Sequence, residues 1–179
     1  MVAGAFGSTT TACASYGAFR RSELVDLNLE QLEFTEQALL VHLAKSKANQ
    51  YGAVEDKAIF YVPNADFCPV RCLRAWLHLL GRTTGPLFVK IPRAAPGQMA
   101  TPSDKRLSGI SINKLVQKRL GPDYSAHSLR VSFVTVALLN GQSHKAIKNQ
   151  TKQKTDAMIE RYTQLNNVVS YNAAQSLGL

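Results

Sequence analysis

The segment His127-Ser128-Leu129-Arg130 carries side chains suited to acting on a phosphate group. Its imidazole and guanidinium lie three positions apart at a predicted helix start, so both can face one anion. The planar guanidinium also matches pairs of phosphate oxygens through its fork of donors. Alone the pattern is weak, because basic proteins contain such pairs by chance, and its meaning depends on the residues that accompany it.

Three other places in the chain carry side chains that complete a set able to cleave a phosphodiester. Arg20 and Glu23 lie three residues apart on one predicted helical face, and Lys47 lies on a long connection between strands. Tyr162 follows Arg130 by 32 residues. Cleavage without a metal needs a nucleophile, charge neutralisation and a proton for the departing oxygen, which these residue types can supply.

The charge of the chain favours a polyanionic partner. Its 179 residues include 21 Lys+Arg and 12 Asp+Glu, which gives a net charge of +9. Residues 101–161 hold 11 basic and 4 acidic residues and so account for +7 of this total. Such a concentration in one third of the chain is typical of a surface that binds nucleic acid.

The composition also indicates the compartment. No apolar run approaches the roughly 20 residues that a transmembrane helix needs, and the first residues lack the blocks of a signal peptide. The odd cysteine count, Cys13, Cys68 and Cys72, favours free thiols in a reducing compartment over disulfides or a zinc site. We therefore expect a cytoplasmic protein with no membrane segment and no metal.

The side chains of this set must be positioned by helices and strands. The predicted helices and strands indicate an α+β fold, mainly helical, with a small three-stranded antiparallel sheet. Residues 1–15 are small and poorly periodic, so we expect a disordered or truncated terminal segment before one domain over 16–179. The predicted strands are 32–36, 38–44 and 57–62, and predicted helices begin at Tyr16, Pro69, Ser111, Ser128, Ser143 and Thr155.

The order Arg, hairpin Lys, H-x-x-R, Tyr resembles the catalytic domain of the tyrosine recombinases, the phage integrase family. Residues 17–24, Gly-Ala-Phe-Arg-Arg-Ser-Glu-Leu, resemble the family's G-x-x-R-x-S-E-L box. Residues 146–162 resemble the approach to the nucleophile in one integrase subgroup, and 172–174 and 177–179 resemble that subgroup's tail. The resemblance covers the chain from about Tyr16 to Leu179.

The resemblance implies site-specific recombination or integration of mobile-element DNA through a covalent 3′-phosphotyrosyl intermediate, with no cofactor. Tyr162 would attack the scissile phosphate, and Lys47 would protonate the departing 5′ oxygen. Two guanidiniums would neutralise the transition state, and His127 would assist proton transfer. The implied catalytic residues are Arg20, Lys47, His127, Arg130, Gln153 and Tyr162, with Glu23 supporting Arg20 or His127.

Double-stranded DNA is the implied partner. The uncharged tail over 163–179 would pack on a neighbouring subunit of a dimer or tetramer on DNA, or back on its own subunit. Basic residues beside the motifs are expected to contact the duplex: Arg21, Lys45, Lys148, Lys152 and Lys154.

The sequence leaves the roles of several of these residues open. His127 also fits a helix cap or a core acceptor, and Tyr162 also fits a buried aromatic ring. Arg21 competes with Arg20 for the role of the first arginine, and Lys45 competes with Lys47 for that of the hairpin lysine.

Two departures from the family pattern bear on activity. Lys152-Gln153 stands where the family has Gly followed by His or Trp, and an amide carries neither a proton nor a charge, so we expect weakened cleavage. Only 19 residues precede Arg20, so we expect a catalytic fragment without the family's smaller amino-terminal DNA clamp. The alternative functions are a relative that binds DNA without cutting it and a type IB topoisomerase.

Overall fold

The computed structural model describes residues 2–43, 55–95, 98, 100–153, 155–157 and 159–160. Helices dominate this part of the chain, and a short 3-10 turn, Leu29–Gln31, leads into the sheet. The helices are α1 Val2–Tyr16, α2 Arg21–Asp26, α3 Pro69–Leu80, α4 Gly109–Leu120, α5 Ala126–Leu139 and α6 His144–Thr151.

The sheet has three antiparallel strands in the order β1-β2-β3, as the sequence predicts. The strands are β1 Leu32–Phe34, β2 Ala38–Leu43 and β3 Glu55–Phe60, each within a few residues of its predicted range. Leu39 pairs with Ile59 and Val41 with Lys57, and all four side chains are buried. Alternation along the strands therefore places Lys57 on the inner face, among apolar neighbours.

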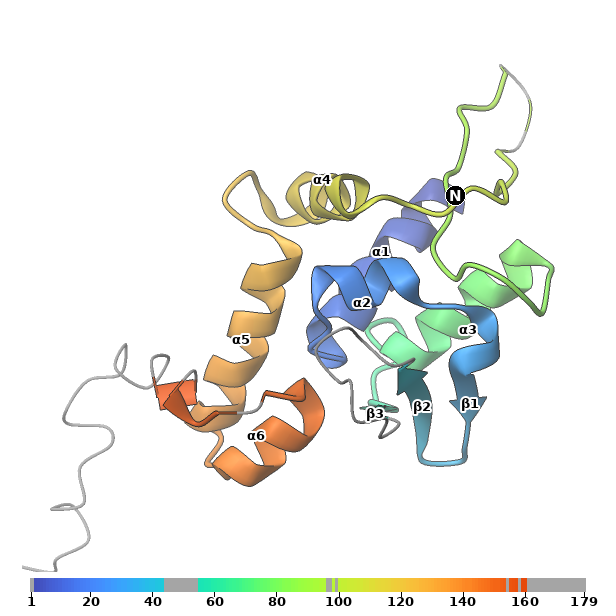
Figure 1. Cartoon of the computed structure of the whole chain (residues 1–179). Helices are drawn as coiled ribbons and strands as arrows, with labels where there is room; N and C mark the ends of the chain where they lie inside the picture. Colours follow the sequence, from blue (N-terminus) through green and yellow to red (C-terminus); the bar gives the residue numbers. More distant parts are fainter. Residues whose placement is uncertain are drawn as a thin grey trace, which may run out of the picture.

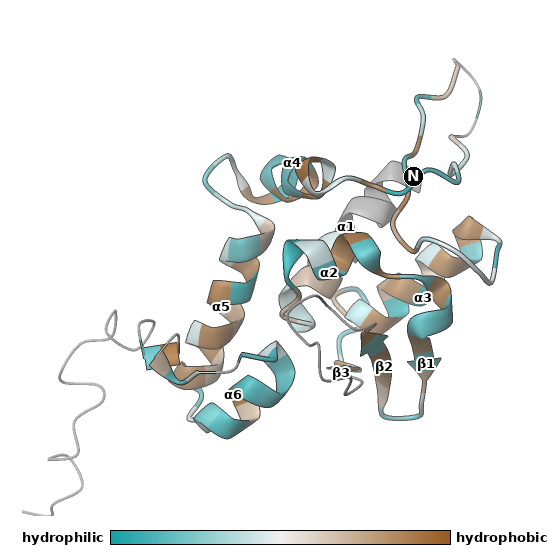
Figure 2. Ribbon diagram, viewed as in Figure 1, coloured by the Kyte–Doolittle hydropathy of each residue, from teal (hydrophilic) through white to brown (hydrophobic). Residues whose placement is uncertain are grey.

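The sheet and α3 lie at one side of the molecule and α5 and α6 at the other, with α1 and α2 between them (Figure 1). Helix α1 packs against α3, α4 and α5, and α6 contacts both α5 and β3. Helix α6 is largely hydrophilic, whereas α3 and α5 alternate hydrophilic and hydrophobic stretches (Figure 2). The segments before α2 and after α6 both adjoin the start of α5, and the candidate site forms there.

Helix α1 is the main difference from the sequence prediction. Residues 2–16 form a helix rather than a disordered segment, and Cys13 and Ala14 are fully buried in the core. The Thr9 hydroxyl donates a hydrogen bond to the Cys72 carbonyl at 3.1 Å. Its small, uncharged side chains give no amphipathic period, but they allow close helix packing, so tertiary contact rather than local pattern defines this element.

Helices α3, α4 and α5 end within one residue of their predicted ends, and α4 and α5 begin two residues before the predicted Ser111 and Ser128. The helix predicted to begin at Tyr16 is wrong, because Tyr16 ends α1 and the next helix begins at Arg21. Ser108, Ser125 and Ser143 each accept a hydrogen bond from a backbone N–H of the first turn of α4, α5 and α6. Gly81 ends α3 with φ of 64°, a left-handed conformation that favours glycine. Trp76 on α3 is fully buried and donates to the Leu87 carbonyl at 3.0 Å, as expected of a core residue.

All three cysteines are free thiols. Within the described ranges, no group of three or more His, Cys, Asp or Glu side chains is placed to hold a metal ion. No helix in that part of the chain has both the length and the apolar character to cross a membrane.

Candidate active site

One pocket of about 410 Å³ brings together most of the predicted site residues that the structure describes. It forms where the segment before α2, helix α4, the start of α5 and the segment after α6 meet (Figure 1). Its lining carries several hydrogen-bond donors, among them three guanidiniums and one imidazole, from Arg20, Arg21, Asn113, Ser125, His127, Arg130 and Gln153. Such a lining suits a phosphate better than an apolar ligand.

Arg20 is the residue that caps α2, and Glu23 fixes it there. The Glu23 carboxylate accepts from the Arg20 backbone N–H at 2.8 Å and from its Nη1 at 2.5 Å. Arg20 Nη2 also donates to the Lys152 carbonyl at 3.0 Å, across to the end of α6. The predicted pairing of Arg20 and Glu23 is present, although through the helix cap rather than a shared helical face.

Arg130 is the buried arginine of the pair, with 5% of its surface exposed, whereas the Arg20 side chain is 44% exposed. Its Nη1 donates to the Ala18 carbonyl at 2.5 Å and its Nη2 to the Thr151 carbonyl at 2.6 Å. Arg130 therefore links the segment before α2 to the last turn of α6. Bonds from both Nη atoms fix the plane of a guanidinium, which a single bond does not.

Lys152 ends α6 in a left-handed conformation, with φ of 55°. The two arginines bind consecutive carbonyls here, Thr151 and Lys152, and so hold the turn that presents Gln153. The family pattern has glycine at position 152, and the left-handed backbone that favours glycine is adopted by the lysine instead. The substitution thus leaves the turn in place.

Gln153 is 7% exposed and faces the pocket. The Thr151 hydroxyl lies between two acceptors, the Ile147 carbonyl at 2.8 Å and Gln153 Oε1 at 3.2 Å, and its single proton favours the nearer carbonyl. Nε2 is the donor that the Gln153 amide can offer to an anion in the pocket.

His127 lies on the first turn of α5, exposed at the pocket and three residues before Arg130. It does not cap the helix, because Ser125 accepts the capping hydrogen bond from Ser128 N–H at 3.2 Å. The arrangement leaves the imidazole facing the same cavity as the two arginines.

Lys57 is a residue that the sequence analysis missed. It is 1% exposed, and its Nζ lies 3.1 Å from Glu23 Oε2 and donates to the Ala18 carbonyl at 2.9 Å. Burial lowers the pKa of Lys57 to about 8, although Glu23 opposes this shift. A lysine that alternates with buried strand residues is the signal that could have found it, since inner-face positions rarely carry a charge.

Burial opposes ionisation of Glu23, yet the charge of Lys57, together with bonds from Arg20 and Lys57, holds the pKa of its carboxyl below the usual value. Asn113, also missed, lines the pocket and accepts from the Ala126 N–H at 3.1 Å, which ties α4 to the start of α5. Only the packed structure shows that α4 reaches the site.

The remaining predicted residues divide into two groups. Arg21 lines the pocket beside Arg20, whereas Lys148 pairs with Asp156 at 2.9 Å and Lys152 Nζ donates to Asn149 at 3.2 Å. Neither of these two lysines lines the pocket. Four predicted residues lie outside the described part of the chain: Lys45, Lys47, Lys154 and Tyr162.

Comparison with known proteins gives one curated sequence relative and several solved structures. No family model matches the chain. The chain is 37% identical over 163 residues to the "Integrase/recombinase xerD homolog" of Selenomonas ruminantium, which covers 88% of this chain and 46% of the relative. The chain thus spans about half the length of that relative.

The structural neighbours show the same fold at low identity. XerA recombinase matches with a TM-score of 0.64 and 19% identity, over 99% of this chain and 62% of that one. XerH site-specific recombinase, bound to its palindromic difH substrate after cleavage, matches with a TM-score of 0.68 and 15% identity, over 96% and 45%. The integrase of transposon Tn1549 matches with a TM-score of 0.53 and 16% identity, over 94% and 57%.

Proposed function

We propose that this chain, which belongs to the tyrosine recombinases, cleaves and rejoins DNA strands through a covalent 3′-phosphotyrosyl intermediate in site-specific recombination or integration. The single observation that carries the proposal is the shared pocket of Arg20, His127, Arg130 and Gln153. These side chains come from three separated segments of the sequence and line one pocket.

The proposed reaction begins with attack by the Tyr162 hydroxyl oxygen on the scissile phosphorus. A phosphorus–oxygen bond to tyrosine forms while the bond to the 5′ oxygen breaks, and Lys47 donates the proton that the 5′ oxygen takes up. The guanidiniums of Arg20 and Arg130 stabilise the added charge on the non-bridging oxygens. His127 assists the proton transfer at the same phosphate by accepting the proton that the Tyr162 hydroxyl loses.

Rejoining is the reverse step, in which a 5′ hydroxyl attacks the phosphotyrosyl bond and releases the tyrosine. The phosphodiester energy is kept in the covalent intermediate, so no ATP or other cofactor is needed. Gln153 donates a hydrogen bond from Nε2 but no proton, which supports a slower enzyme than one with histidine there. A relative that binds DNA without cutting it is the second candidate, and Gln153 is the observation that favours it.

Double-stranded DNA is the proposed substrate, and the cytoplasm is the proposed compartment. The proposed contacts to the duplex outside the pocket come from Lys45, Lys148, Lys152 and Lys154, with Arg21 at the pocket edge. Lys148 would exchange its partner Asp156 for a phosphate, which makes its contribution salt-dependent.

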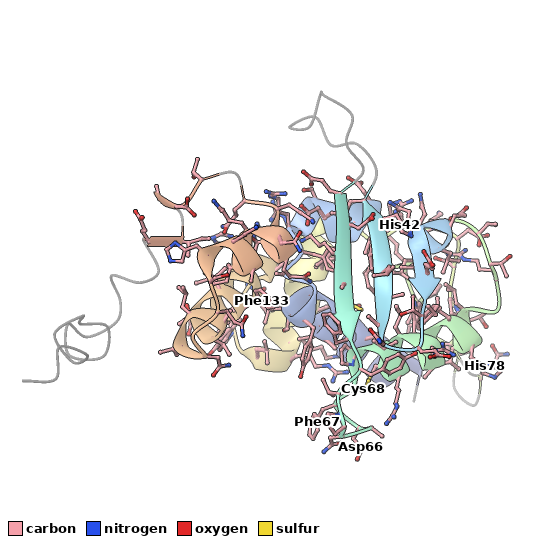
Figure 3. All side chains as sticks on the ribbon, turned by 90° about the horizontal axis from the view of Figure 1, so that it is seen from below. His42, Asp66, Phe67, Cys68, His78 and Phe133 are labelled. Carbon is pink, nitrogen blue, oxygen red and sulfur yellow. The ribbon has the colours of Figure 1, made fainter. Side chains whose placement is uncertain are left out.

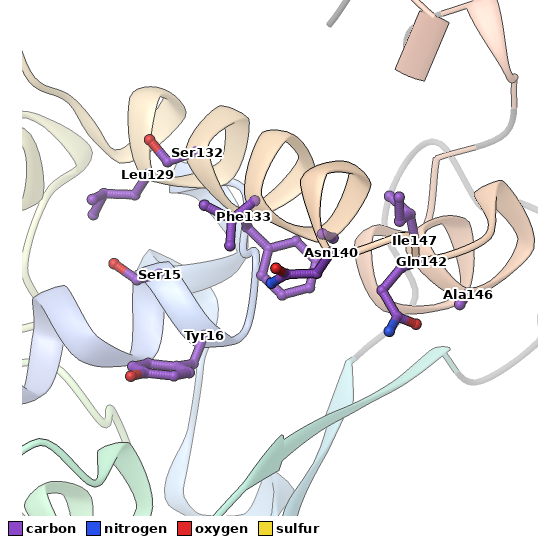
Figure 4. A pocket seen from close by; sticks show the side chains of 11 residues that line it. Ser15, Tyr16, Leu129, Ser132, Phe133, Asn140, Gln142, Ala146 and Ile147 are labelled. Carbon is purple, nitrogen blue, oxygen red and sulfur yellow. The ribbon is translucent and has the colours of Figure 1, made fainter. Parts of the chain in front are cut away.

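An apolar groove supports the proposed assembly through the tail. The groove holds about 590 Å³ between α1 and α5, with α6 at one end (Figure 4), and Tyr16, Leu129, Phe133, Val136 and Ile147 contribute to its lining. The tail over 163–179 has no charged residue and carries several apolar ones. We propose that the tail of a neighbouring subunit fills this groove in a dimer or tetramer on DNA; tail binding within one subunit would instead leave the protein monomeric on DNA.

A nicked suicide DNA substrate tests the proposed activity. Cleavage near the nick releases a short strand that diffuses away, so the protein stays attached to DNA and is detected as a denaturant-resistant adduct. We expect an adduct with the wild type, with or without EDTA, and none with Tyr162→Phe. An adduct that persists in Tyr162→Phe contradicts the assigned nucleophile, and binding without any adduct favours the second candidate.

A further inference from the structure

We propose that the Lys57 ammonium is a positioning group that holds Arg20 and Arg130 in their phosphate-binding arrangement. This proposal rests on the proposed function, since it concerns how the arginines of that site are fixed. Lys57 does not line the pocket and is 1% exposed, so it acts through other residues rather than on the DNA.

Burying a lysine at this position of the sheet costs free energy, because the ammonium loses its water. Lys57 pairs with Val41 on β2 and alternates with Ile59 on β3, and both neighbours are fully buried. An apolar side chain there would extend the core of the sheet at no cost in desolvation. A buried charge in such a place needs partners that compensate for the loss of water, and the partners identify what it does.

Three oxygens surround Nζ and match its three N–H donors. They are Glu23 Oε2 at 3.1 Å, the Ala18 carbonyl at 2.9 Å and the Gly17 carbonyl at 3.2 Å. The Phe19 ring covers the ammonium from another side, with its centroid 4.6 Å away. All of these groups belong to the segment that leads into α2 and to its first turn, so Lys57 fixes that segment onto the sheet.

Each arginine shares one acceptor with Lys57. The Ala18 carbonyl accepts from Lys57 Nζ and from Arg130 Nη1, and the Glu23 carboxylate accepts from Lys57 Nζ and from Arg20. Ala18 has φ of 46°, an uncommon conformation for a residue with a side chain, which aims its carbonyl at this cluster. Loss of the ammonium would therefore loosen one anchor of each guanidinium at the same time.

The charge of Lys57 can be titrated in an accessible range, which provides a test. Its pKa is lowered to about 8, by burial first and also by Arg130 and Arg20, against Glu23. These three residues are the charged groups that face Nζ among the described residues. Above pH 8 the wild type loses the ammonium, and its site should then behave like that of a variant with a neutral residue.

The experiment measures single-turnover adduct formation on the suicide substrate for the wild type, Lys57→Met and the control Lys90→Met. Lys90 is an exposed lysine that does not line the pocket. We expect Lys57→Met to bind DNA with unchanged affinity and to form adduct about 10- to 100-fold more slowly at pH 7, because small displacements of catalytic groups cost rates of this order. Lys90→Met should cleave at the wild-type rate.

The pH dependence separates positioning from general stability. The ratio of wild-type to Lys57→Met rates should fall toward one as the pH rises through about 8, since deprotonation removes the same ammonium. A ratio near one at pH 7, or a large ratio that does not change with pH, overturns the proposal.

If circular dichroism shows that Lys57→Met does not fold, Lys57→Arg replaces it, because arginine keeps its charge at all these pH values. The wild-type rate should then decline above pH 8 relative to that of Lys57→Arg, and parallel profiles overturn the proposal. The wild type is assayed first: no adduct from it would show that the proposed function fails, independently of Lys57.

Discussion

The sheet carries a charged cluster on each face, and the two clusters differ in burial rather than in chemistry. On the inner face Lys57 meets Glu23, with side chains 0% and 11% exposed. On the outer face lies His42, which is labelled in Figure 3. It lies between Asp56 at 2.8 Å and Glu33 at 3.1 Å, and all three side chains are at least 36% exposed. Lys57 and Asp56 are adjacent in sequence, and strand alternation alone separates them.

The difference shows that burial determines how much an ion pair contributes to stability. Water screens the outer cluster, so its members can reorient and contribute little to stability. The inner cluster has lost its water and is held by fixed distances, so removing one member leaves a buried charge or carbonyl without its partner. The inner cluster also bonds Arg20 directly and shares the Ala18 carbonyl with Arg130, so its geometry is transmitted to the site.

The largest loss of cleavage rate is expected at Arg130, where the inner cluster of Lys57 and Glu23 adjoins the pocket. Arg130→Lys keeps the charge but loses the two-pronged bonding to the Ala18 and Thr151 carbonyls. We expect adduct formation to slow by about 10³-fold, the range found when an oxyanion-stabilising donor is removed. The matched control is Arg93→Lys, at an exposed arginine outside the pocket. A rate within threefold of the wild type would contradict the role given to the guanidinium.

Glu23→Gln is expected to have an intermediate effect on both stability and cleavage. The amide keeps the shape of the side chain but leaves Lys57 and Arg20 without their shared carboxylate, which should cost about 3 kcal/mol of unfolding free energy at neutral pH. Cleavage should slow by about 10-fold, since Arg20 keeps its bond to the Lys152 carbonyl. Urea unfolding and adduct formation measure the two effects.

The pH dependence of this stability difference follows from the pKa of Glu23, which is lowered in the folded state. Its contribution is present above the unfolded value of about 4.3 and is lost as the pH falls through the folded value. The wild type and Glu23→Gln should therefore converge in unfolding free energy in acid. A difference that stays constant from pH 7 into acid would show that the carboxylate charge is not what stabilises the site.

The same contrast explains what the sequence could predict. Arg20, His127 and Arg130 belong to short local patterns, and the three strands and the helices after Pro69 have local periods and caps, so each was predictable without the fold. Lys57 was not, because its importance depends on which face of β3 turns inward and on what lies across from it. Helix α1 was missed for a related reason: its residues show no helical period in the sequence, and its packing against α3, α4 and α5 is visible only in the fold.

The smallest change in unfolding free energy is expected on the outer face, from His42→Gln. Its two carboxylate neighbours raise the pKa of His42, with the bond to Asp56 the larger cause. A raised value means that the cluster stabilises the fold below the unfolded pKa of about 6.5 and loses this contribution as the pH rises through the folded value. Because the side chains are well exposed, we expect a loss of less than about 1 kcal/mol at pH 5.5 and none at pH 8.5, measured by urea unfolding. Cleavage should be unchanged at both pH values, since His42 contacts neither arginine. A cleavage defect in His42→Gln would mean that the two faces of the sheet are coupled, and the contrast between them would then lie in something other than burial.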